Sequence, residues 1–336
     1  MHFPMLTPKR APLASIGKLI AAAEFQDLSK GFAAKFPEET AAVFLPKQAL
    51  LDCIATYPGL SGISFRYGLT NMADPLNRKI IMVPCEHTTD GNGLPDLLFF
   101  RDGYVSSDNI KISLDQFWEL IGNHVERTYN SKYHFVLSKV HRGYFWGIKR
   151  LKTLLDLDEC GGLVFHFGYN SIHPNPLKRF QNILEVAGED QQGRGIFMEY
   201  GQCNPPCEDD GSGGGVGTTG ICFLQELAGR YAKRNAEQQL DILRSFRDDY
   251  MLEQPGGYAL YEMYYYLSRP VFLAIQSQPD HEEIWRNLYR NELQHALTLI
   301  AEQKMEQALT LYKQIMQQLL YTYVLERPVM SLNLSV

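Results

Sequence analysis

The sequence predicts an α+β fold, in which two tandem, related helix–helix–β-hairpin units precede an all-α helical bundle. The first observation is that Ser61–Leu69 and Gly161–Tyr169 share an alternation of apolar and polar residues that ends near a glycine. Such alternation is typical of a half-buried strand followed by a turn. The second is the Gly-rich run Gly211–Gly220, and the third is the helical spacing of apolar residues beyond it.

The first α+β unit is expected to occupy residues 1–102. A helix is predicted at Ile16–Ala23, and a second helix at Leu50–Ile54, where the apolar side chains share one face. The strand Ser61–Leu69 follows, and the β-branched run Ile80–Val83 is expected to pair with it.

The second unit is expected to occupy residues 103–208 and to repeat the same order of elements. Ser113 and Gln116 have the spacing of a capping box, which predicts the start of a helix. The expected elements are helices at Leu114–Val125 and Ile148–Leu155, then strands at Gly161–Tyr169 and Ile183–Val186. The shared order predicts a tandem duplication, with a boundary near residues 102–110.

A Gly-rich linker is expected at residues 209–221, and a helical domain at residues 222–336. A glycine-rich chain loses much conformational entropy on ordering, so we expect the linker to be exposed. The expected helices are Ala236–Tyr250, Tyr258–Gln276, Glu282–Ala301 and Met305–Val324. Pro270 predicts a kink or break in the second of them.

The composition argues against several classes of partner. The net charge is −6, and residues from Cys222 onward contain 11 basic and 14 acidic residues, so neither half is basic. This argues against nucleic acid and anionic membranes as main partners. No apolar run approaches the roughly 18–20 residues of a membrane span, and no signal peptide is evident. We expect a cytoplasmic bacterial protein, although secretion without a signal peptide stays open.

The cysteines provide the densest candidate chemistry. Cys203 and Cys207 could form a disulfide or a redox pair, or could bind zinc together with Cys222, although a structural zinc site needs about four ligands. Cys222 is also a candidate nucleophile, because it precedes a predicted helix whose N-terminus would lower the thiol pKa. The alternative is that the thiols are free and structural. Glu292 and His295 form a single E-x-x-H, whereas a di-iron bundle needs two.

Two further patterns receive mainly structural interpretations. Gly215–Gly220 matches G-x-G-x-x-G, but an acidic, turn-like segment precedes it where a dinucleotide site needs a buried strand. No cofactor is therefore expected. Tyr258, Tyr261 and Tyr265 are candidates for an interaction surface, since tyrosine is common at interfaces, or else for the helical core.

Three segments beyond the linker, Cys222–Leu224, Leu243–Asp248 and Tyr264–Pro270, resemble the CFI-box C-terminal domain in order and spacing. The resemblance spans about residues 220–276, with Leu224 in place of the isoleucine of the box. The N-terminal half resembles an uncharacterised bacterial repeat family that ends in a Cys-Pro-Pro-x-Cys-like motif, here Cys203–Cys207. Both resemblances imply architecture and no established activity.

These observations favour a protein without enzymatic activity that binds another protein of unknown identity. A cysteine-dependent enzyme or thiol switch that uses Cys203, Cys207 or Cys222 is the alternative. A secreted or injected bacterial effector is a further alternative. The oligomeric state is left open by the sequence.

Overall fold

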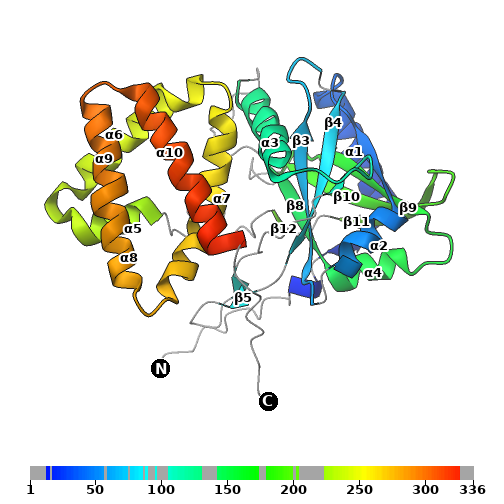
Figure 1. Cartoon of the computed structure of the whole chain (residues 1–336). Helices are drawn as coiled ribbons and strands as arrows, with labels where there is room; N and C mark the ends of the chain where they lie inside the picture. The colour runs from blue at the N-terminus through cyan, green and yellow to red at the C-terminus, as the bar shows by residue number, and fades with distance from the viewer. Residues whose placement is uncertain are drawn as a thin grey trace, which may run out of the picture.

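The computed structural model describes residues 13–15, 17–56, 59–74, 76–85, 88–89, 95–96, 105–130, 142–173, 179–199, 202–203 and 223–325 of the 336-residue chain. Antiparallel sheets flanked by helices lie on one side of the molecule, and a helical bundle lies on the other (Figure 1). The predicted α+β class and the helical C-terminal region are confirmed. Within the described ranges, no helix is long and apolar enough to cross a membrane.

The elements alternate in the N-terminal part and become helical after residue 223. The N-terminal elements are η1 (Leu13–Ser15), β1 (Lys18–Ile20), α1 (Ala22–Lys35), β2 (Ala42–Pro46), α2 (Lys47–Thr56), β3 (Gly62–Leu69), β4 (Arg78–Cys85), β5 (Thr88–Thr89), β6 (Pro95–Asp96), β7 (Val105–Ser106), α3 (Leu114–Tyr129), β8 (Gly143–Gly147), α4 (Ile148–Leu155), β9 (Gly162–Tyr169), β10 (Phe180–Ala187), β11 (Gly193–Glu199) and β12 (Gln202–Cys203). The bundle contains α5 (Phe223–Tyr231), α6 (Ala236–Asp249), α7 (Gly257–Gln276), α8 (His281–Asn287), α9 (Gln294–Ala301) and α10 (Met305–Leu320). Short 3₁₀ and π turns connect or extend these helices.

The boundaries differ from the sequence prediction in three places. The helix predicted at Ile16–Ala23 is wrong, because Lys18–Ile20 forms an edge strand on β11 and the helix begins at Ala22. The strand β11 was not predicted. Of the kink or break predicted at Pro270, the break is wrong, since α7 runs through it from Gly257 to Gln276, with Leu267 and Val271 fully buried on either side. Tertiary packing overrides local propensity in each case.

Each five-stranded sheet combines strands from both sides of the predicted boundary at residue 102. One sheet has the order β1-β11-β10-β9-β2, and the other has the order β12-β8-β3-β4-β7. The strand β2 thus pairs with β9, while β8 pairs with β3. The preceding helices follow the same exchange, because α1 packs on β9 and α3 packs on β3. The first repeat therefore supplies α1, β1 and β2 to the sheet of the second repeat, and the second supplies α3, β7, β8 and β12 to the sheet of the first.

The two repeats match in hydrogen-bond detail. The amide of Lys47 donates to the carbonyl of Gly161 at 2.9 Å, and the amide of Ile148 donates to the carbonyl of Ser61 at 2.8 Å. Gly62 and Gly162 also lie at corresponding positions, where an aromatic ring closely approaches the backbone of each glycine. A Cβ on Gly62 would lie 2.4 Å from the ring of Phe145, and a Cβ on Gly162 would lie 2.6 Å from the ring of Phe44. The strands β3 and β9, within the predicted Ser61–Leu69 and Gly161–Tyr169, therefore make corresponding contacts.

The strand β4 is buried on both faces, because each face belongs to a different core. Ile80 and Met82 face the core between the two sheets, together with Phe65 and Phe165. The alternate residues, including Ile81, belong to a second core that extends into the bundle. This alternation follows from the two-residue period of a strand. The bundle is thus continuous with the outer face of one sheet.

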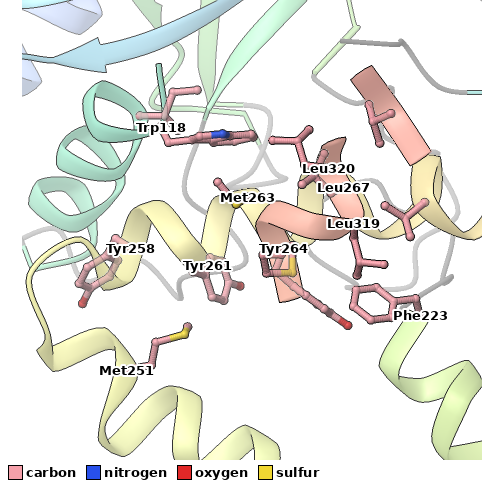
Figure 2. Close-up of a cluster of buried hydrophobic side chains, with 14 of the residues drawn as sticks. Trp118, Phe223, Met251, Tyr258, Tyr261, Met263, Tyr264, Leu267, Leu319 and Leu320 are labelled. Carbon is pink, nitrogen blue, oxygen red and sulfur yellow. The ribbon is translucent and has the colours of Figure 1, made fainter. Parts of the chain in front are cut away.

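The helices α3 and α7 form the main contact between the two sides of the molecule (Figure 1). The predicted capping box starts α3, since the amide of Gln116 donates to the Ser113 hydroxyl and the amide of Ser113 donates to the Gln116 side chain. Figure 2 shows Trp118 of α3 beside Met263 of α7. The helices approach closely at Gly122, where a Cβ would lie 2.7 Å from the amide nitrogen of Ala259.

Candidate functional site

The structure describes little of the cysteines that the sequence analysis selected. The backbone of Cys203 lies in β12, opposite Tyr144 of β8. Its side chain lies outside the described residues, as do Cys207 and Cys222 altogether. The predicted disulfide, metal and nucleophile roles of these three residues therefore stay predictions.

The other three cysteines are free and buried. Burial raises the pKa of the Cys53 thiol to about 12. Burial also raises the pKa of Cys85 to about 12, and it raises the pKa of Cys160. A thiol with such a pKa is almost entirely protonated near neutral pH and is a poor nucleophile. These three side chains act as small apolar core residues.

The candidate interaction tyrosines lie mostly in the interior. Tyr258 is 5% exposed and Tyr261 is 4% exposed, so both rings belong to the core shared by α7 and its neighbours (Figure 2). Tyr265 is half-buried, and Arg247 Nη1 donates to its hydroxyl oxygen at 2.9 Å. In this arrangement the first two rings mainly stabilise packing, and Tyr258 also lines a cavity beside α3.

A partly open apolar cavity of about 320 Å³ lies inside the bundle, and we call it the bundle cavity. Its walls come from α5, α6, α7, α9, α10 and the turns next to them. The lining residues are Phe223, Leu224, Gln225, Leu227, Leu240, Leu243, Arg244, Phe246, Arg247, Met251, Tyr264, Tyr265, Ser268, Leu288, Glu292, Leu293, Ala296, Ile300, Ala308, Tyr312, Ile315 and Met316. Side chains of Phe223–Leu224, Leu243–Arg247 and Tyr264–Ser268 are among those that line it.

Among the charged side chains that line the bundle cavity, the arginines have ion-pair partners and the glutamate has none among the described residues. Arg244 Nη1 lies 2.6 Å from Glu237 and 2.7 Å from Asp241, and Arg247 Nε lies 2.6 Å from Asp248. Glu292 also lines the cavity, and its carboxylate makes no ion pair or hydrogen bond with another described residue. The lining therefore carries two arginines that are already paired with acidic neighbours, and one glutamate, Glu292, that has no such partner among the described residues.

A second, smaller pocket of about 60 Å³ lies between the two sheets and is flanked by α1 and α3; we call it the junction pocket. Its lining residues are Phe32, Phe36, Glu39, Tyr67, Arg78, His124, Arg127, Thr128, Phe167, Gly168, Phe180, Gln181 and Asn182. These side chains come from both repeats, because β3 and β9 meet across the contact between the sheets, with the rings of Tyr67 and Phe167 5.4 Å apart.

Hydrogen bonds connect the side chains of one wall of the junction pocket, which contains Glu39, Tyr67, Arg78 and Arg127 and which we call the polar wall. Glu39 accepts from Arg78 Nη2 at 2.6 Å and from Arg127 Nη2 at 3.1 Å. Arg127 Nη1 also donates to the carbonyl of Met72 at 2.7 Å. The hydroxyl of Tyr67 donates to Asn182 Oδ1. The bonds to Glu39 and Met72 thus position the guanidinium groups of both arginines.

The polar wall is largely removed from water. Burial lowers the pKa of Arg78, and the neighbouring carboxylate of Glu39 opposes that effect. Burial raises the pKa of Tyr67 well above its ordinary value, while Arg78 and the hydrogen bond to Asn182 act in the opposite direction. Both groups thus lie in a medium of low dielectric constant, where hydrogen bonds and charges interact strongly.

Sequence reasoning did not select any residue of the junction pocket. Glu39, Tyr67, Arg78 and His124 come from different elements and share no local motif. Among the described residues, no group of three or more His, Cys, Asp and Glu side chains could hold a metal ion. Of the E-x-x-H pair, Glu292 lines the bundle cavity and His295 is exposed.

Comparison of the chain with protein-family models, with curated proteins and with solved structures gives no match. The features that bear on function are therefore the cavities among the described residues, which also include a more open one of about 430 Å³ lined by α3 and α7.

Proposed function

We propose that this chain is a protein-interaction module whose bundle cavity binds the apolar face of a partner helix that carries a basic residue. The observation that carries the proposal is the apolar cavity of about 320 Å³ among the helices of the bundle. Ligand pockets commonly measure about 300–1,000 Å³ and combine apolar walls with a few polar groups. An amphipathic helix docks in such a site through side chains at positions i, i+3 or i+4, and i+7.

The composition of the wall supports an apolar anchor. Leu224, Leu243, Leu288 and Ile315 are only partly buried although they are large and apolar, and all of them face the cavity. An apolar side chain that fills the cavity removes this surface from water, at about 25 cal/mol per Å².

The charges favour a basic group on the partner. Arg244 and Arg247 already pair with acidic neighbours of the same helix, whereas Glu292 has no described partner. A Lys or Arg of the bound helix would pair with Glu292 at the edge of an apolar surface. Such charge complementarity raises the association rate and favours correct partners over acidic ones.

A cysteine-dependent enzyme or thiol switch is a second proposal, and it has less structural support than helix binding. The described thiols of Cys53, Cys85 and Cys160 are buried and protonated. The residues on which that alternative depends lie outside the described part of the chain, so no geometry supports it.

The test is fluorescence anisotropy with a labelled amphipathic helix of roughly 16 residues that has leucines on one face and lysines beside them. We expect saturable binding to the full chain. Ala296→Trp, which fills the cavity, should weaken binding by at least about tenfold, equivalent to about 1.4 kcal/mol. Glu292→Gln should weaken binding less, mainly through the association rate.

The matched control is Gln314→Trp, which adds the same side chain to an exposed position of α10. This variant should bind the helix as the wild type does. A second peptide with glutamates in place of the lysines should bind more weakly. The proposal is wrong if Ala296→Trp and Gln314→Trp bind equally well, or if the acidic peptide binds as tightly as the basic one.

A further inference from the structure

The junction pocket is built from equivalent positions of the two repeats that have diverged in chemistry. The contacts of Gly68 with Leu120 and of Gly168 with Leu28 align α3 with α1, and this alignment places His124 at the position of Phe32. By the same alignment Thr128 corresponds to Phe36.

The strands extend this correspondence. The pairs Leu69–Arg78 and Tyr169–Phe180 occupy equivalent ends of the two hairpins, so Arg78 corresponds to Phe180. Tyr67 likewise corresponds to Phe167. One side of the pocket is therefore aromatic where the equivalent side is polar. Packing alone would be satisfied by two similar walls, whereas a ligand with one charged end and one apolar end requires two different walls.

The polar wall has an excess of positive charge. Among the described lining residues, Arg78 and Arg127 are the cations and Glu39 is the carboxylate, which both arginines share. The other titratable side chains that line the pocket are Tyr67 and His124. The two arginines and the one carboxylate therefore have a net positive charge, and these side chains are mostly shielded from water. An anion of the right size would balance this charge.

The polar wall also has an unused donor. Arg78 Nε is fully buried and has no hydrogen-bond partner among the described residues. Its guanidinium carbon lies over the Phe167 ring, 4.7 Å from the ring centre. A buried N–H without an acceptor is unfavourable, so this atom is a ready donor to an oxygen that enters the pocket.

We propose that the junction pocket binds a short-chain monocarboxylate, with its carboxylate on Arg78 Nε and its alkyl end against Phe32, Phe36 and Phe180. The volume of about 60 Å³ accommodates roughly four to six non-hydrogen atoms, at about 10–15 Å³ for a water-sized atom. A guanidinium donates to a carboxylate that lies in the guanidinium plane, and Arg78 Nε is the donor that has no partner among the described residues. The site is separate from the bundle cavity and is independent of the proposed function.

The test is isothermal titration of the full chain with sodium butyrate, with butyramide and with inorganic phosphate. We expect butyrate to bind, butyramide to bind at least about tenfold more weakly, and phosphate not to compete. Butyramide has the same shape without the charge, so this comparison isolates the anion. Equal binding of butyrate and butyramide, or preference for phosphate, would overturn the assignment.

The variant Arg78→Lys keeps the positive charge beside Glu39 and removes the Nε donor. It should weaken butyrate binding at least about tenfold, whereas Arg194→Lys, at an arginine paired with Asp190 away from the pocket, should have no effect. Butyrate should also shift the Arg78 Nε–H resonance of the wild-type protein in ¹⁵N-labelled arginine spectra. This measurement does not depend on how a variant folds, and an unshifted resonance at saturating butyrate contradicts the proposal.

Discussion

At the scale of single residues, the pair Arg142–Glu262 joins the bundle to a sheet. Arg142 Nε lies 2.5 Å from Glu262 Oε2 and Arg142 Nη2 lies 2.7 Å from Glu262 Oε1, and the side chains are only 5% and 6% exposed. Burial alone would lower the pKa of Arg142, but the Glu262 carboxylate reverses that effect and the pKa is raised. The charges are therefore stable only as a pair.

We predict that Glu262→Gln lowers the free energy of unfolding by about 3–5 kcal/mol, because it leaves a buried guanidinium without its counter-charge. Urea titration followed by circular dichroism measures this difference. The double variant Arg142→Met/Glu262→Met removes both charges and should lose less stability than Glu262→Gln. If the loss of stability in the double variant equalled the sum of the losses caused by its two single substitutions, this account would be contradicted.

Because the thiols of Cys53 and Cys85 are buried, we predict that the free energy of unfolding falls as the pH rises into the alkaline range. The pKa values of Cys53 and Cys85 are raised to about 12, whereas an exposed thiol titrates near 9. Between these values the unfolded chain loses protons that the folded chain keeps, so stability falls as pH rises. The slope is at most about 1.4 kcal/mol per pH unit for each thiol.

Thermal unfolding between pH 8 and pH 11 measures this effect. Cys85→Ala lowers stability at pH 8 through lost packing, but its midpoint should fall less steeply with pH than that of the wild type. A slope unchanged by the substitution would show that other groups, such as the buried tyrosines, control the alkaline limit.

At the scale of elements, the contact between α3 and α7 depends on a small residue. A Cβ on Gly122 would lie 2.7–2.9 Å from backbone and side-chain atoms of Ala259. We predict that Gly122→Ala lowers the free energy of unfolding by about 1–3 kcal/mol through overpacking, despite the better helix propensity of alanine.

The matched control is Gly229→Ala in α5. Nothing lies within 4 Å of a Cβ at this position, so the same change should be neutral or stabilise by up to about 1 kcal/mol. Urea titration of both variants compares them directly. Equal effects at the two positions would mean that the α3–α7 contact has no steric limit at Gly122.

The sequence predicts which segments form helices and strands better than it predicts which strands pair with each other. Alternation in Ser61–Leu69 and Gly161–Tyr169 identifies β3 and β9 as strands. The expectation that such a strand is half-buried is wrong for β3, which is buried at every position because helices cover its second face. The edge strand β1 was wrongly predicted as helix, since its three residues are strand only through pairing with β11.

The candidate sites were harder to predict. Apolar spacing indicated the helices around the bundle cavity, but not the space between them. The junction pocket gave no sequence signal, because Glu39 and Arg78 meet only after strands of both repeats have paired. Sites assembled by long-range pairing are invisible to local patterns.

At the scale of the whole molecule, the exchange of α1–β2 and α3–β8 makes each repeat incomplete alone. We predict that fragment 1–102, expressed by itself, is unfolded or pairs with a second copy of itself, because its β2 lacks β9 and its β3 lacks β8. Coexpression with fragment 103–336 should restore a one-to-one complex. Size-exclusion chromatography with light scattering, together with circular dichroism, separates these outcomes, and a folded monomer of 1–102 would contradict the prediction.

The exchanged strand β2 also has a consequence for the timing of synthesis. Phe44 and Leu45 leave the ribosome well before their partners Val164 and Leu163 exist. Since translation proceeds at roughly 5–20 residues per second, the strand waits on the order of 6–24 s for its partner. During that interval the nascent chain presents an unpaired apolar strand, so we expect chaperones to bind it until β9 has been synthesised.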